Sequence, residues 1–88
     1  MFSDNPVKEK IYSIIKNTAA ENEYIDLTGS FEDIGIGSID IIKIMVGIEE
    51  HYFIEIEEKY YINEEYENIE CFINKMAEYV SVYMNNST

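Results

Sequence analysis

The sequence predicts an all-α fold: a small helical bundle of three main helices and one short one, with a long first loop. Three segments repeat apolar residues at the three- and four-residue spacing of an amphipathic helix. A strand is the competing interpretation for the isoleucine-rich run 39–48, but that run lacks the alternation of a half-buried strand. Eighty-eight residues, 47% of them hydrophobic, are enough for one domain with a small core. We therefore expect residues 1–88 to form a single domain.

The first helix is expected to begin at Pro6 and to fade by about Ala20. Proline is favoured in the first turn of a helix, and Asn5 before it is a good N-cap residue. The apolar residues of this segment share one helical face: Val7, Ile11, Ile14 and Ile15.

Residues 21–37 form the expected long loop, which is rich in turn-forming residues. Phe31 and Ile34 are its expected anchors in the core. The glycines of the loop can supply positive φ angles just before Ser38. A loop of this length in a small domain is often functional.

The second helix is expected over Ser38–Tyr52, and its apolar surface is wider than a surface helix needs. The middle of that surface suits the core: Ile41, Ile44, Met45 and Ile48. Ile39, Ile42 and Val46 form one edge, and Glu49 interrupts it. Because a glutamate is rarely buried unpaired, we expect this edge at the surface, as a docking strip. The polar side of the helix is expected to hold Asp40, Lys43, Gly47 and Glu50.

A short helical turn is expected near Glu58–Ile62, and the last helix is expected to follow Asn68 as its N-cap. One apolar stripe runs along this helix: Ile69, Phe72, Ile73, Met76, Val80, Tyr83 and Met84. Cys71 falls opposite the stripe and is expected to be a solvent-accessible thiol. The tail Asn85–Thr88 is expected to fray.

The charge of the chain restricts the classes of partner. Eighteen acidic residues against six lysines give a net charge of −12. Nucleic-acid binding needs a basic footprint, and anionic membrane surfaces attract basic segments, so neither is expected. An acidic surface instead steers the chain toward basic partner proteins.

The location of the protein is also an expectation from sequence. No segment has the length of a membrane span or the pattern of a signal peptide. A single cysteine fits a reducing compartment. We expect a cytoplasmic monomer.

Neither a catalytic residue nor a metal site is expected, so the chain is not predicted to be an enzyme. A Ser-His-Asp device would need His51, the only histidine, which lies about 20 Å along the helix from Ser38. Cys71 has no Cys/His cluster that could bind zinc, and no loop matches the calcium-binding pattern.

Ser38 is the residue that the local sequence singles out. It follows a loop ending in Gly-Ile-Gly, starts a helix, and has no base nearby in sequence. Such a serine is better suited to being modified than to attacking a substrate. At a helix start, an attached phosphate would lie against free backbone N–H groups, which favours the anion by about 0.3–1 kcal/mol.

The stretch from Ser38 to Glu58 resembles the acyl carrier protein family without a gap. The resemblance lies in four features: Ser38 followed by Ile39 and Asp40; Glu49, Glu50 and Tyr52 at the helix end; the Glu55-Ile56-Glu57 stretch; and the lead-in residues Phe31, Asp33, Ile34 and Gly35. The resemblance extends more loosely to both outer helices.

This resemblance implies a non-catalytic carrier. Its 4′-phosphopantetheine arm would be esterified to Ser38 and would hold acyl intermediates as thioesters for fatty-acid, polyketide or related lipid biosynthesis. The implied partners are a phosphopantetheinyl transferase and acyl-transferring or synthase enzymes with basic docking patches. The expected docking surface joins the apolar edge to nearby acids: Asp40, Ile42, Val46, Glu49, Glu50 and Glu55.

Two departures from the family pattern keep alternatives open. Gly37 stands where the family usually has aspartate, and Lys43 stands where carriers of fatty-acid synthesis usually have an acid. Both weaken the assignment to the housekeeping fatty-acid pathway and leave room for a specialised carrier, for instance in polyketide, lipid-tailoring or aminoacyl (D-alanyl-type) pathways. The remaining alternative is an acidic helical interaction module without a prosthetic group, which would not need the loop-glycine-serine-helix arrangement.

Overall fold

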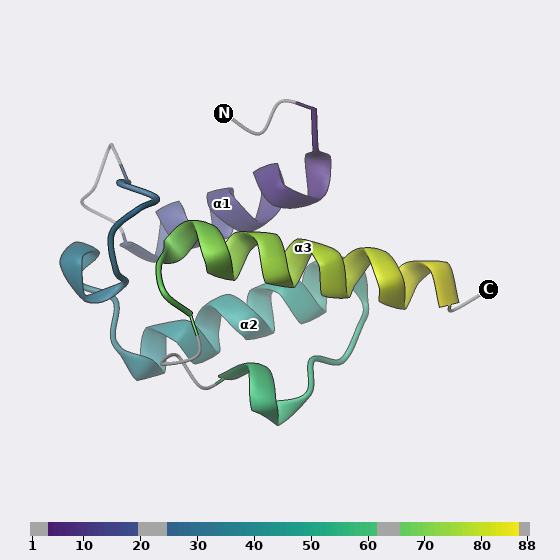
Figure 1. Ribbon diagram of the computed structural model, residues 1–88. Coiled ribbons are helices and arrows are strands. Elements are labelled where there is room, and N and C mark those ends of the chain that lie inside the picture. Colours follow the sequence, from purple (N-terminus) through teal and green to yellow (C-terminus); the bar gives the residue numbers. More distant parts are fainter. Residues whose placement is uncertain (1–3, 20–24, 62–65, 87–88) are drawn as a thin grey trace.

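Three α-helices and two short 3₁₀ helices make up the computed structural model, which describes residues 4–19, 25–61 and 66–86 (Figure 1). The elements in chain order are α1 (Pro6–Ala19), η1 (Glu32–Ile34), α2 (Ser38–Tyr52), η2 (Glu58–Tyr61) and α3 (Ile69–Asn86). No strand occurs in these three ranges. The predicted all-α fold, the bounds of α2 and the short turn after it are confirmed.

The helices assemble around α1, which packs against both α2 and α3 (Figure 1). Most residues of the faces that periodicity assigned to the core are buried, and Val7 and Ile14 of α1 are half-buried against it. Those of α1 and α2 contribute Ile11, Ile15, Ile41, Ile44, Met45 and Ile48. The stripe of α3 contributes Ile69, Phe72, Ile73, Met76 and Val80.

The last part of α3 differs from the prediction. Tyr83 and Met84 continue the apolar stripe in sequence but are exposed. Figure 1 shows the reason, because the end of α3 projects beyond the other helices. The helix runs through Asn86, into the segment expected to fray, and residues 87–88 lie outside the described ranges. Near the start of the same helix, Cys71 was expected to be a solvent-accessible thiol but is only half-buried.

Asparagine side chains cap two of the helices, as predicted. Asn5 Oδ1 accepts a hydrogen bond from the Lys8 N–H at 3.1 Å, at the start of α1. Asn68 Oδ1 accepts one from the Cys71 N–H at 2.8 Å, at the start of α3. Each cap satisfies one N–H group that has no partner inside its helix.

The described part of the long loop is anchored in the core. Phe31 is buried, and its ring packs edge-to-face on Phe72 with 5.2 Å between centroids. Ile34 is half-buried against the core, and Ile36, which the sequence analysis did not single out, is buried. Gly35 has the expected positive φ, 76°. These anchors lead the chain directly to the start of α2.

Gly47 corrects one prediction. It does not belong to the polar side of α2, because a Cβ placed there would lie 3.3 Å from Ile14 Cγ2 of α1. Gly47 therefore allows α1 and α2 to approach closely. A helical wheel of α2 alone cannot reveal this contact.

Gly47→Val is expected to lower the free energy of unfolding by about 1–3 kcal/mol, because the added atoms overpack the contact with Ile14. Urea denaturation measures the change. Lys43→Val, one turn earlier at an exposed position, is the control. It should cost only the propensity difference, about 0.5 kcal/mol. Equal losses in the two variants would contradict the close contact.

Candidate functional site

Ser38 is the first residue of α2 and is exposed to solvent. The N-cap residue before it is Gly37, which has no side chain to accept a hydrogen bond. In a capping box, the N-cap side chain accepts from the backbone of the fourth residue, and the side chain of that residue accepts from the N-cap N–H. Only the second contact is present here, because the Gly37 N–H donates to Asp40 Oδ2 over a long 3.4 Å. The first turn of α2 is thus left without a side-chain cap.

The start of α3 shows the opposite arrangement. Its first two N–H groups, those of Ile69 and Glu70, donate to the loop carbonyl oxygens of Gly29 (3.0 Å) and Leu27 (2.9 Å). The Asn68 side chain accepts from the third. Every N–H of the first three residues of α3 therefore has an acceptor.

The corresponding N–H groups of α2 remain open. Within the described part of the chain, no hydrogen bond reaches the N–H of Ser38, Ile39 or Asp40. Open N–H groups at the positive end of a helix dipole form a site that favours an anion. This anion site lies at the position of the exposed serine.

Ser38 has no histidine beside it in the structure. His51, the histidine that a Ser-His-Asp device would need, lies in the last turn of α2, about 20 Å along the helix axis from the serine. No group of three or more His, Cys, Asp or Glu side chains in the described ranges is placed to hold a metal ion.

The apolar edge of α2 is at the surface, as predicted. Ile39, Ile42 and Val46 are 71%, 46% and 38% exposed, respectively. We call these three residues the α2 strip. It begins beside Ser38 and follows the helix toward its C-terminal end.

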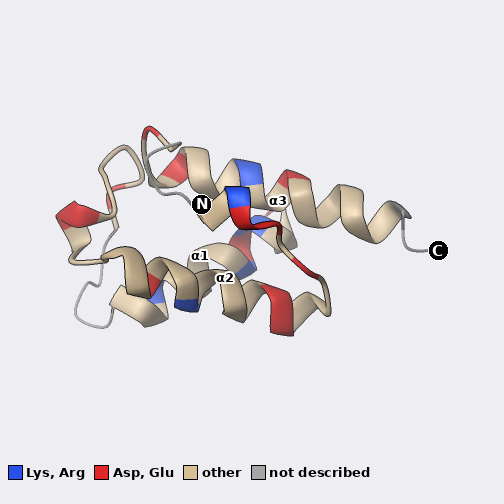
Figure 2. Cartoon of the chain, turned by 90° about the horizontal axis from the view of Figure 1, so that it is seen from below, with Lys and Arg blue, Asp and Glu red and all other residues tan. Residues whose placement is uncertain are grey.

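Acidic residues accompany the α2 strip. Figure 2 shows them at both ends of α2 and on the segment that follows it. Glu50 and Glu55 are exposed, and Asp40 is half-buried. These three carboxylates remain predicted docking residues together with Ile42 and Val46.

Glu49 has a structural role that the sequence analysis missed. Its Oε2 accepts a hydrogen bond from the Ile56 N–H at 2.8 Å, and its Oε1 accepts one from the Tyr61 hydroxyl at 3.1 Å. Burial, and then the hydrogen bond to the Glu49 carboxylate, raise the pKa of Tyr61. We call this pair of contacts the Glu49 brace, since it holds the segment after α2 against the helix. A docking role for Glu49 stays a prediction.

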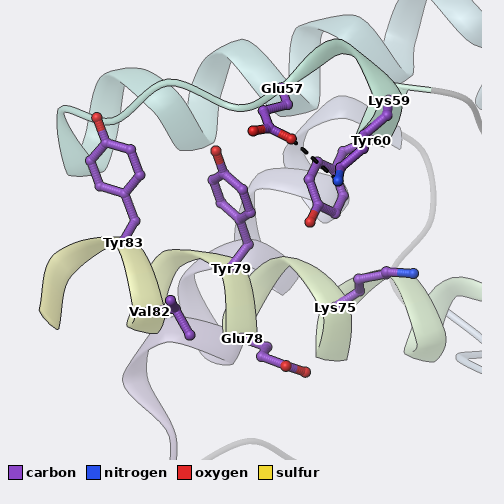
Figure 3. A pocket seen from close by; sticks show the side chains of 8 residues that line it. All are labelled: Glu57, Lys59, Tyr60, Lys75, Glu78, Tyr79, Val82 and Tyr83. Carbon is purple, nitrogen blue, oxygen red and sulfur yellow. Dashed lines mark ion pairs between the residues drawn. The ribbon is translucent and has the colours of Figure 1, made fainter. Parts of the chain in front are cut away.

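A cavity of about 640 Å³ lies between η2 and α3, away from Ser38 (Figure 3). Its lining consists of Glu57, Lys59, Tyr60, Lys75, Glu78, Tyr79, Val82 and Tyr83. The Tyr79 hydroxyl donates to the Glu55 carbonyl oxygen at 2.6 Å, which ties α3 to the segment after α2. None of the predicted site residues lines this cavity. The hydrogen bond from Tyr79 instead holds the acidic segment that follows α2.

Comparison with known proteins gives one informative similarity. Over 52 residues the chain is 36% identical to acyl carrier protein 2, chloroplastic, of Hordeum vulgare. The aligned stretch spans 57% of this chain and 40% of the barley protein. No protein-family model matches the chain, and no solved structure matches it. The similarity points to the acyl carrier protein family without establishing membership.

None of the helices in the described ranges combines the length and the apolar character required to cross a bilayer.

Glu49→Ala is expected to lower the free energy of unfolding by about 1–3 kcal/mol, because it leaves the part-buried Ile56 N–H without its acceptor. Glu50→Ala changes the neighbouring, exposed glutamate and should stay within about 0.5 kcal/mol of the parent chain. Thermal and urea unfolding of both variants measure the difference. If the two substitutions have the same effect, the Glu49 brace does not contribute to stability.

Proposed function

We propose that this chain is a carrier protein whose Ser38 holds a 4′-phosphopantetheine arm. The observation that supports it most is the open first turn of α2, where free N–H groups meet an exposed serine. In α3 of the same chain, by contrast, every N–H group of the first three residues has an acceptor. The similarity to a protein named acyl carrier protein supports the same conclusion.

Attachment would proceed by transfer from coenzyme A. The Ser38 Oγ would form a new O–P bond to the β-phosphorus of coenzyme A, and the bond from that phosphorus to 3′,5′-ADP would break. The serine proton would leave to a base of the transferase. The N–H groups of Ser38, Ile39 and Asp40 are the donors available to the new phosphodiester.

The arm, once attached, supplies a thiol that carries acyl groups as thioesters, so this chain needs no catalytic residue of its own. We propose that residues 1–88 act as one carrier domain. The α2 strip and the acids beside it, Asp40, Glu50 and Glu55, would bind enzymes whose apolar surface has a basic rim.

Incubation with coenzyme A and a broad-specificity phosphopantetheinyl transferase is expected to add one phosphopantetheine group per chain, read by intact mass. Ser38→Ala should abolish the addition, because it removes the hydroxyl group at the open turn. Ser81→Ala, at an exposed serine of α3, should load normally. Addition at another residue would contradict the assignment of Ser38.

Gly37→Asp provides a control for the departure from the family pattern. A Cβ at position 37 meets no atom within 4 Å, and the residue has an ordinary φ of −98°, so the backbone accepts a side chain there without strain. If the parent chain fails to load but Gly37→Asp loads, the transferase used requires the aspartate. If neither loads with several transferases, the chain is an acidic interaction module and the carrier proposal is wrong.

Glu50→Lys is expected to raise the KM of the transferase for this chain by about two- to fivefold, because it reverses an exposed charge beside the α2 strip. Added sodium chloride should raise the KM in the parent chain, since exposed charges are screened within about 8–10 Å at physiological salt. Glu9→Lys makes the same charge change on α1 and is the matched control. Equal effects of the two reversals would mean that only net charge matters and that docking lies elsewhere.

A further inference from the structure

Phe53 occupies an unusual position at the C-terminal end of α2. It is the residue just past the helix, with φ 56° and ψ 49°, and it is the only non-glycine residue with positive φ in the described ranges. Its side chain is 91% exposed. Glycine is the usual residue at this place, because a Cβ in the left-handed region costs about 1–2 kcal/mol.

The helix end does not need a phenylalanine. The hydrogen bonds that close α2 use only backbone, since the N–H groups of Phe53 and Ile54 both donate to the Glu49 carbonyl oxygen. The apolar contact that accompanies such an ending comes from Ile54, which is buried. The Phe53 side chain thus adds strain and an exposed ring without contributing to the cap or the core.

A single exposed apolar residue is ordinary on a protein surface, but Phe53 ends a helix that already has three. Ile39, Ile42 and Val46 are exposed on α2, and Phe53 is exposed at its C-terminal end. Phe53 therefore adds a fourth exposed apolar residue, at the far end of the helix that bears the α2 strip.

The charges around Phe53 indicate what covers it. Residues 49–58 contain five glutamates and no lysine, and most of these carboxylates are exposed. An apolar ring among acids is complementary to an apolar pocket with a basic rim. Buried aromatic anchors surrounded by a polar rim dominate the affinity of many protein interfaces.

The footprint of one partner can reach both ends of α2. From Ser38 to Phe53 the helix spans about 22 Å. A standard interface covers about 800 Å² on each side, which corresponds to a patch about 32 Å across. An enzyme that seats on the α2 strip to reach Ser38 can therefore contact Phe53 as well.

We propose that Phe53 is an anchor residue that inserts into a basic-rimmed apolar pocket of the phosphopantetheinyl transferase acting on Ser38. This inference rests on the proposed carrier function. It explains the strained Phe53 by its contact with the partner enzyme. It also predicts that replacing Phe53 by glycine weakens binding and raises stability.

Phe53→Gly tests the proposal with two readouts on the full chain. The thermal midpoint of the unmodified protein should rise by about 4–8 °C, because glycine relieves the left-handed strain. The KM of the transferase for the variant, at saturating coenzyme A, should rise by about 5- to 30-fold with kcat little changed. Phe53→Leu keeps an apolar side chain and should give a KM between those of the parent chain and Phe53→Gly.

Val82→Ala is the matched control, since it trims an exposed apolar residue of α3 outside the α2 strip. It should leave KM unchanged. Normal loading of Phe53→Gly with an unchanged KM overturns the anchor role and leaves the carrier function standing. Absence of loading in the parent chain and in Gly37→Asp overturns both.

Discussion

Two backbone hydrogen bonds, from the Ile69 and Glu70 N–H groups to the loop carbonyl oxygens, determine where the long loop lies. They join two segments that are about forty residues apart in sequence and satisfy the first turn of α3 at the same time. Phe31 then packs on Phe72 of that helix, so the loop is fixed by polar and apolar contacts together. Because the loop ends at Gly37, the position of Ser38 follows from these contacts.

The two ends of α2 are built differently, and the residue at each end, Ser38 or Phe53, is exposed to solvent. At the N-terminal end, a glycine without a side chain leaves three N–H groups open beside Ser38. At the C-terminal end, backbone hydrogen bonds close the helix at a phenylalanine in a left-handed conformation. Between them, the Glu49 brace holds the acidic segment against the helix. One helix thus contains the proposed modification site, the α2 strip and the acids that accompany it.

Features that depend on local sequence could be predicted, and those that depend on packing between elements could not. The asparagine caps, the bounds of α2 and most of the core faces follow from periodicity and residue type, and the structure confirms them. The roles of Gly47 and Glu49 could not be predicted, because a helical wheel does not show residues of other elements. Gly47 contacts Ile14 of α1, and Glu49 binds Ile56 and Tyr61 after α2. Tyr83 and Met84 keep the helical period, but the other helices do not extend far enough to cover them.

The composition of the core affects how much side-chain entropy this small domain loses on folding. Most of the buried side chains in the described ranges are isoleucine. In a helix, a β-branched side chain has essentially one χ1 rotamer. Fixing an isoleucine costs about 0.5–1 kcal/mol of side-chain entropy, against about 1.5–2 kcal/mol for methionine. A domain with little surface to bury therefore loses less rotameric freedom on folding than a methionine-rich core of the same volume would.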